Sequence, residues 1–167
     1  MQLVKSPDPW LQTKVAPFDF DKLNAKEISD EMINIMEQNQ GLGLSANQVG
    51  LDAQIFVMVQ YMKPEVRPVT IINPVIESVT ANTEQQPEGC LSHDLLFFKV
   101  TRPRGVIVSF VDIDNNPCTL ELYDIDARCF LHEYDHLQGI QFTDRVSKLR
   151  LDRAKIKQKK LRKLKHG

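Results

Sequence analysis

Long apolar stretches are missing from this 167-residue sequence, and cysteine is scarce. No run approaches the roughly 18 apolar residues of a membrane-spanning helix, so we expect no membrane partner. The three cysteines, Cys90, Cys118 and Cys129, are an odd and sparse set that indicates a reducing compartment rather than a disulfide framework. The opening MQLVKSPDPWL contains no apolar segment of signal-peptide length. These absences predict a cytoplasmic protein.

Nucleotide-binding motifs are absent as well. No GxGxxG or Walker loop opens a helix, and predicted strands do not alternate with helices, so the pattern argues against a Rossmann fold. We expect no DNA partner. The length suits one domain with a core of its own.

Charge is unevenly distributed, although the formal net charge is only −1. Residues 1–147 carry 11 Lys and Arg against 21 Asp and Glu, whereas residues 148–167 carry 10 Lys and Arg against the single acid Asp152. We therefore predict one acidic domain over 1–147 and a basic C-terminal helix over 148–167 appended to it. Such a helix is typical of a segment that meets a polyanion. The apolar residues expected to pack it on the body are Leu149, Ile156, Leu161 and Leu164.

Local patterns predict an α+β fold, with mixed or antiparallel sheets around a central helix. Asn24 is a suitable N-cap for a first helix, and Gly139 is a suitable stop for the central one. The stretch 82–87 is rich in turn-forming residues. The predicted helices are 25–39, 124–138 and 147–165. The predicted strands are 54–60, 69–73, 75–80, 105–112 and 118–123, with an edge or break at Pro74.

The sharpest motif is HEYDH, over residues 132–136. Residues i and i+4 of a helix lie on one face, so His132 and His136 can bind one metal ion. Glu133 lies beside them, where it can handle the proton of a metal-bound water. The alternative is a pair of unliganded histidines on a polar helix, because HExxH also arises by chance.

A third metal ligand would have to come from upstream of this helix. Phe142 stands where a third histidine would follow, and no glutamate comes after Glu133. The candidates are Cys90, Cys118, Cys129 and His93. Cys118 is interpreted as a small core residue, and Cys129 as one that lines the site. Cys90, in the segment EGCLS, would complete a Cys-His-His set with an open fourth position, as catalytic metals have.

The segment GLGLSANQ, residues 41–48, follows the first predicted helix. Its two glycines allow the backbone to approach a ligand closely, and Gln48 offers an amide donor. An ordinary helix-ending loop is the alternative, so this segment alone decides nothing.

Taken in order, GLGLSANQ, EGCLS and HEYDH resemble the three motifs of the peptide deformylase family, GxGLAAxQ, EGCLS and HExDH. The opening PDPWL is similar to the family's N-terminal segment, so the resemblance runs from about residue 3 to 148. It implies a metal-dependent hydrolase that removes the formyl group from formyl-methionyl nascent polypeptides and releases formate. A metal-bound water would attack the formyl carbon, with Glu133 as general base and then general acid.

The resemblance also implies the site. Cys90, His132 and His136 would bind one divalent metal ion, Fe²⁺ in natural members, with Ni²⁺, Co²⁺ or Zn²⁺ as substitutes in purified protein. The Gln48 side-chain amide and the Leu91 backbone N–H would stabilise the oxyanion. The residues expected to contact the peptide are Leu42, Gly43, Leu44, Glu88, Gly89, Ile125 and Cys129.

Several positions depart from the family pattern. Ser45 stands where alanine is usual, a change small enough to be tolerated. His93 and Asp94 stand where a hydrophobic residue and proline are common, and Phe97 replaces a common arginine. We expect these changes to alter peptide preference, with His93 at the surface or in the groove rather than on the metal. Such a groove suggests a phage or unusual bacterial source, and hence the cytoplasm of a bacterium or of a phage-infected host.

Two other functions compete with this interpretation. A different metal amidase with the same centre would act on unformylated peptides, and an RNA-binding module would hold a structural metal through four protein ligands. In a deformylase, the tail over 148–167 could dock on ribosomal RNA, whose phosphates Lys and Arg contact without reading sequence. A solvated, solubilising helix is the alternative for the tail. The protein is expected to be a monomer.

Overall fold

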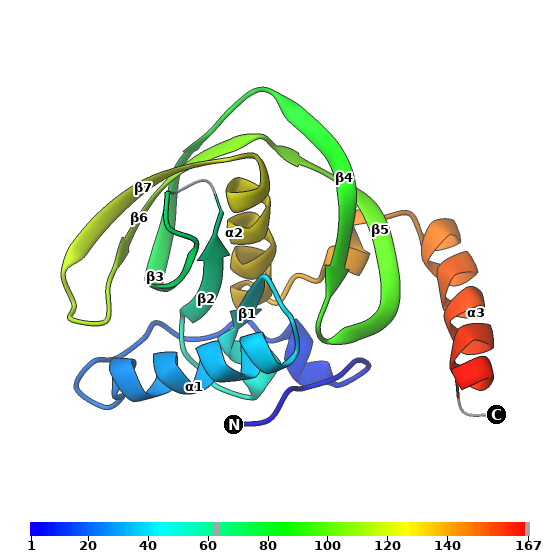
Figure 1. Cartoon of the computed structure of the whole chain (residues 1–167), viewed down its shortest axis with the longest axis horizontal. Coiled ribbons are helices and arrows are strands. Elements are labelled where there is room, and N and C mark those ends of the chain that lie inside the picture. The colour runs from blue at the N-terminus through cyan, green and yellow to red at the C-terminus, as the bar shows by residue number, and fades with distance from the viewer. Residues whose placement is uncertain (62–63, 166–167) are drawn as a thin grey trace.

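The computed structural model describes residues 1–61 and 64–165, with side chains as far as residue 161. Helix α2 (Asp124–Leu137) runs through the middle of the molecule, with a five-stranded sheet on one side and a two-stranded hairpin on the other (Figure 1). All strand pairs in both sheets are antiparallel. The predicted α+β class is confirmed, and the central helix carries the HEYDH motif.

The five-stranded sheet has the order β1-β2-β3-β6-β7. Its strands are β1 (Gly43–Ser45), β2 (Ile55–Gln60), β3 (Arg67–Val79), β6 (Gly105–Val111) and β7 (Pro117–Tyr123). Strand β2 contacts both α1 (Ala25–Gln38) and α2, so both of its faces are buried, as its run of apolar residues predicts. The predicted break at Pro74 is a bulge within the continuous strand β3, where the pairing with β6 shifts and Asn73 has a φ of 49°.

Strands β4 (Thr83–Cys90) and β5 (His93–Pro103) form the hairpin. The sequence predicted a turn-prone stretch over 82–87, and this is wrong. Asn, Gln and Pro have little β-propensity, but pairing with β5 along the whole of β4 fixes the strand. The turn lies at Leu91 and Ser92 instead. Because Cys90 ends β4 immediately before this turn, the hairpin carries it toward the central helix.

Helix α2 is buried almost along its whole length. Its apolar residues join the main core, where Phe130 packs edge-on against Phe56 of β2 at 5.3 Å between ring centroids. The helix ends as predicted, with Gly139 in the left-handed region at a φ of 73°. Since its polar side chains are also enclosed, each of them needs a partner inside the protein. These partners build the candidate site.

Helix α3 (Lys148–Lys165) lies at the margin of the molecule, next to β5 (Figure 1). Leu151 and Ala154 pack against a small apolar cluster of the hairpin and of helix η3 (Phe142–Arg145). The residues predicted to pack this helix on the body are exposed instead: Leu149 is 60% exposed, Ile156 58% and Leu161 37%. The side chain of Leu164, the fourth predicted residue, lies outside the described residues. At 100° per residue, Leu149 and Ile156 lie roughly opposite the 151/154 face. Over the described chain, no helix is both long and apolar enough to cross a membrane.

Candidate active site

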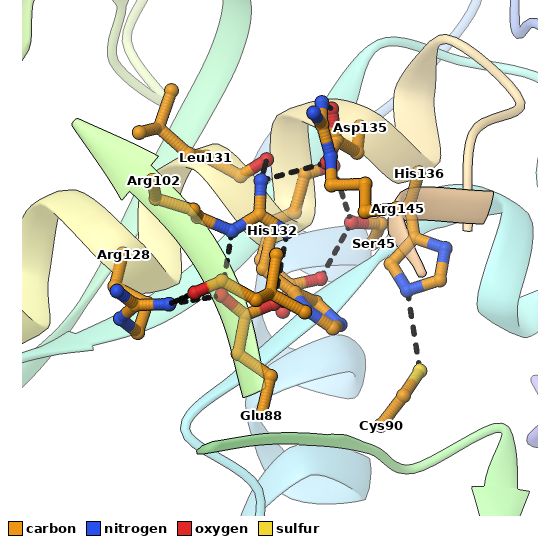
Figure 2. A network of polar contacts seen from close by, with 12 residues as sticks. Ser45, Glu88, Cys90, Arg102, Arg128, Leu131, His132, Asp135, His136 and Arg145 are labelled. Carbon is orange, nitrogen blue, oxygen red and sulfur yellow. Dashed lines mark hydrogen bonds and ion pairs between the residues drawn. The ribbon is translucent and has the colours of Figure 1, made fainter. Parts of the chain in front are cut away.

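Three predicted metal ligands converge where the hairpin meets α2. Cys90, His132 and His136 each place one donor atom within 4.8 Å of the others. The Cys90 Sγ lies 3.2 Å from His136 Nε2 (Figure 2), and the two imidazole centroids are 5.0 Å apart on successive helical turns. A thiolate with two imidazoles suits Zn²⁺, Fe²⁺ and related transition metals.

The electrostatics of these donors fit a cation. Burial lowers the pKa of His132, but its hydrogen bonds with Cys90 and Glu88 outweigh burial and raise that pKa to about 10. Burial, together with the neighbouring His132, holds the pKa of His136 well below its usual range, so this imidazole is neutral, as a ligand must be. The groups that stabilise positive charge on His132 would also stabilise a divalent cation bound beside it.

The other two cysteines and His93 lie away from this cluster. Cys129 is buried and its thiol donates to the Leu42 carbonyl at 3.3 Å. Cys118 was predicted to be a core residue, but it is half-exposed on β7, an edge strand. His93 was predicted at the surface or in the groove; it is buried instead, with Nε2 2.6 Å from Gln141 Oε1 and its ring against Phe142. Strand alternation turns His93 inward, toward η3.

The carboxylate of Glu88 orients the imidazole of His132. One carboxylate oxygen accepts a hydrogen bond from His132 Nδ1 at 3.1 Å, while Arg102 and Arg128 donate to the same carboxylate at 2.6–2.9 Å (Figure 2). Burial alone would raise the pKa of Glu88, but the bonds from His132 and Arg102 lower it to about 2. The ionised carboxylate therefore leaves Nε2 of His132 free to face the cluster. Glu88 was predicted to contact the peptide; it borders the cavity, but its carboxylate is committed to this network.

Asp135 extends the network along the same helix. Arg102 Nη1 donates to Asp135 at 2.8 Å, and Arg145 of η3 donates to both oxygens of that carboxylate, with Nε at 2.6 Å. The hairpin, the central helix and η3 are thus joined by buried charge pairs. The sequence did not predict this network, although Asp135 stands within the HEYDH motif.

Glu133 follows His132 on α2 and is buried against β1. Ser45 Oγ donates to Glu133 Oε2 at 2.7 Å and lies 2.9 Å from the backbone oxygen of Glu133. A Cβ on Gly43 would stand only 2.5 Å from Glu133 Oε1, so glycine is required for this approach. Burial raises the pKa of Glu133, opposed in part by His132 and by the Ser45 hydroxyl. A carboxyl group with a raised pKa is suited to proton transfer near neutral pH.

Gln48 points its amide group at the site. Its Oε1 accepts the Ser45 backbone N–H at 2.9 Å, which fixes the amide plane. Its Nε2 then donates to Ser92 Oγ at 3.1 Å and lies 3.4 Å from Cys90 Sγ. Gln48 and Leu91, predicted to stabilise an oxyanion, both line the same cavity.

That cavity has a volume of about 330 Å³ and ends at the ligand cluster. Cys90, His132 and Glu133 lie among its walls, and three exposed apolar residues, Leu42, Phe97 and Ile125, also line it. The remaining predicted peptide contacts that line it are Gly43, Glu88, Gly89 and Cys129.

Leu44 is not among the lining residues, so its side chain does not reach the cavity and its predicted contact with the peptide stays a prediction. The side chain is fully buried in the core. Successive residues of a strand point to opposite faces, so Gly43 and Ser45 face Glu133 while Leu44 faces away from it.

Comparisons with known proteins point to one family. The family model for polypeptide deformylase matches residues 1–152. Peptide deformylase of Chromohalobacter salexigens is 34% identical over 160 residues, which are 96% of this chain and 94% of that protein. Peptide deformylase 1B of Arabidopsis thaliana is 36% identical over 153 residues, 91% of this chain; the chain spans about half of that plant relative, 56% of its length.

A solved structure shows the same fold. The crystal structure of a peptide deformylase from Synechococcus elongatus in complex with actinonin has a TM-score of 0.87 and 33% identity, covering 95% of this chain and 87% of that one. The family model, the relatives and the shared fold lead to one assignment: this chain belongs to the polypeptide deformylase family.

Proposed function

We propose that this chain hydrolyses the N-terminal formyl group of formyl-methionyl nascent polypeptides and releases formate. The observation that carries the proposal is the Cys90–His132–His136 cluster beside the buried Glu133, at the end of a cavity with an apolar rim. Family membership supports the same reaction. We further propose that the protein works in the bacterial or phage-infected cytoplasm, as a monomer.

The three ligands would hold one divalent cation, with Fe²⁺ as the natural one. When bound, such a cation would supply Lewis acidity and lower the pKa of a water molecule. Glu133 would accept the proton of the attacking water as the C–O bond forms at the formyl carbon. It would then deliver that proton to the departing amine nitrogen as the C–N bond breaks.

The negative charge that develops on the formyl oxygen needs donors. The Gln48 amide and the Leu91 backbone N–H would supply them, because both line the cavity next to Cys90. The Gln48 amide is already oriented by its bonds to Ser45 and Ser92. The amide would therefore need little reorientation when the oxyanion forms.

The methionine side chain would lie against Leu42, Ile125 and Cys129. Burial raises the pKa of the Cys129 thiol well above its usual value, so this wall is neutral and apolar at neutral pH. Gly43 and Gly89 line the cavity and would present backbone groups to the peptide, and Phe97 would meet the residues that follow methionine.

We also propose that residues 1–147 form the catalytic domain and that the appended helix 148–167 docks on ribosomal RNA. Lys155, Lys157, Lys159 and Lys160 are exposed along α3, and the segment carries ten basic residues against one acid. Phosphate contacts of this kind need positive charge and little sequence readout.

The reaction is tested by formate release from formyl-Met-Ala-Ser, with anaerobically prepared protein loaded with Fe²⁺ or Ni²⁺. We expect release of formate in step with the free amine. Absence of formate despite bound metal would refute the proposal, and cleavage of acetylated or unformylated peptides at a similar rate would favour a broader amidase. A Glu133→Gln variant should keep its metal and lose turnover.

A further inference from the structure

We infer that Ser45 is a positioning residue for Glu133 and that turnover in this chain depends on its hydroxyl group. The inference rests on the proposed function, in which Glu133 moves the proton. It adds a residue that the motif comparison treated as a neutral replacement for alanine.

The contact itself is enclosed. Ser45 is 0% exposed and Glu133 only 4%, so no bulk water competes for the 2.7 Å bond between Ser45 Oγ and Glu133 Oε2. The backbone oxygen of Glu133 is a second acceptor at 2.9 Å. A hydroxyl donates a stronger hydrogen bond to an ionised carboxylate than to a neutral carbonyl, so the proton is directed to Oε2 when Glu133 is ionised.

Strand β1 contacts both oxygens of the Glu133 carboxylate. Gly43 and Ser45 are two residues apart on β1, and therefore point to the same face. Glycine leaves room for Oε1, and the serine hydroxyl binds Oε2. The carboxylate can then adopt one orientation beside the ligand cluster, instead of turning about its side-chain bonds.

Ser45 also connects the two groups that the reaction requires. Its backbone N–H donates to Gln48 Oε1, while its side chain donates to Glu133. One residue of β1 thus sets both the proton-transfer carboxylate and the proposed oxyanion donor. Replacement of Ser45 by alanine removes the bond to Glu133 but keeps the bond to Gln48, because the backbone N–H is retained.

Alanine at this position could not donate a hydrogen bond to Glu133. Within the described residues, no other side chain donates a hydrogen bond to the Glu133 carboxylate.

The experiment compares Ser45→Ala with the parent protein and with Ser29→Ala. Ser29 is a matched control, because it is also buried and its hydroxyl lies 2.6 Å from Thr70 Oγ1, in a contact between α1 and β3. We expect Ser45→Ala to lower kcat about 10-fold, with KM and bound metal unchanged. Complete loss of general acid–base catalysis lowers kcat by roughly 10²–10⁴-fold, and a Glu133 carboxylate that is present but poorly oriented should lose part of that factor. Ser45→Thr, which keeps the hydroxyl, should recover most of that loss, and Ser29→Ala should leave kcat unchanged.

A crystal structure of Ser45→Ala provides a readout that does not depend on activity. We expect the Glu133 carboxylate to occupy more than one rotamer there. An unchanged kcat, an effect confined to KM or to metal content, or a Glu133 carboxylate in its original single orientation would overturn the inference. If the parent protein itself releases no formate, the proposed function fails, and the Glu133 rotamer in the variant still decides whether Ser45 positions it.

Discussion

Glu88 Oε2 accepts a hydrogen bond from His132 Nδ1 at 3.1 Å, and this contact joins the candidate metal site to a buried cluster of arginines. Arg102 continues from Glu88 to Asp135, and Arg145 binds Asp135 from the other side. The hairpin, the central helix and η3 are therefore fixed to one another by the same charges that orient a metal ligand. We therefore expect changes in this charge network to affect both stability and metal binding.

Replacement of Glu88 by glutamine should be strongly destabilising. The change keeps the shape of the side chain but leaves Arg102 and Arg128 without their shared buried counter-charge, a loss of about 3–5 kcal/mol. The free energy of unfolding in urea, measured with metal-free protein, tests this. Glu84→Gln is the control, because Glu84 lies on the same strand and its side chain accepts an exposed hydrogen bond from Gln86. Equal stability of both variants would show that the network contributes little.

Replacement of Cys90 by serine should remove most of the bound metal. A hydroxyl is a far poorer ligand than a thiolate for a transition metal next to two imidazoles. Metal content after dialysis against a weak chelator, read by elemental analysis, measures the effect. Cys118→Ser should retain its metal, since Cys118 is half-exposed on β7 and outside the cluster. Full metal retention in Cys90→Ser would contradict the ligand assignment.

Elements whose pattern is local could be predicted from the sequence. Helix α1 begins after Asn24, whose side chain accepts the Glu27 N–H at 3.2 Å, and the predicted range 25–39 differs from Ala25–Gln38 by one residue. The same holds for α2, which Gly139 terminates. In both cases caps and apolar spacing act within a few residues of the chain.

Contacts between distant residues could not be predicted in this way. Strand β4 is formed by pairing with β5, which overrides the turn-forming composition of residues 82–87. The bond from Ser45 to Glu133 spans 88 residues, and the one from Glu88 to His132 spans 44. The motifs identify which residues meet at the ligands, but the roles of Ser45 and of the Glu88 carboxylate depend on the tertiary packing that surrounds them.

Replacement of Phe97 by arginine should change the preference for the residue after methionine. Phe97 is 71% exposed at the cavity, and its ring covers Gly89 on the neighbouring strand. An apolar side chain of the peptide would bury area against this ring at roughly 25 cal/mol per Å², whereas a carboxylate would gain nothing from it. We expect the parent protein to favour formyl-Met-Leu-Ser over formyl-Met-Glu-Ser in kcat/KM, and Phe97→Arg to reduce or reverse that ratio. An unchanged ratio would place Phe97 outside the peptide contact.

Neutralising exposed lysines of α3 should weaken binding to ribosomes. We propose Lys157, Lys159 and Lys160→Gln as one variant, with Lys22, Lys26 and Lys99→Gln as a control of equal charge change on the body. Each lost phosphate contact should lower the slope of log K against log salt by about 0.7–0.9, so the α3 variant should show a flatter salt dependence as well as lower affinity. Sedimentation with purified ribosomes over a range of salt concentrations measures both. Because Leu151 and Ala154 remain in place to hold the helix on the hairpin, deformylation of a short peptide should be unaffected. Equal binding by both variants, or binding that does not respond to salt, would mean that the basic helix is only a solvated surface.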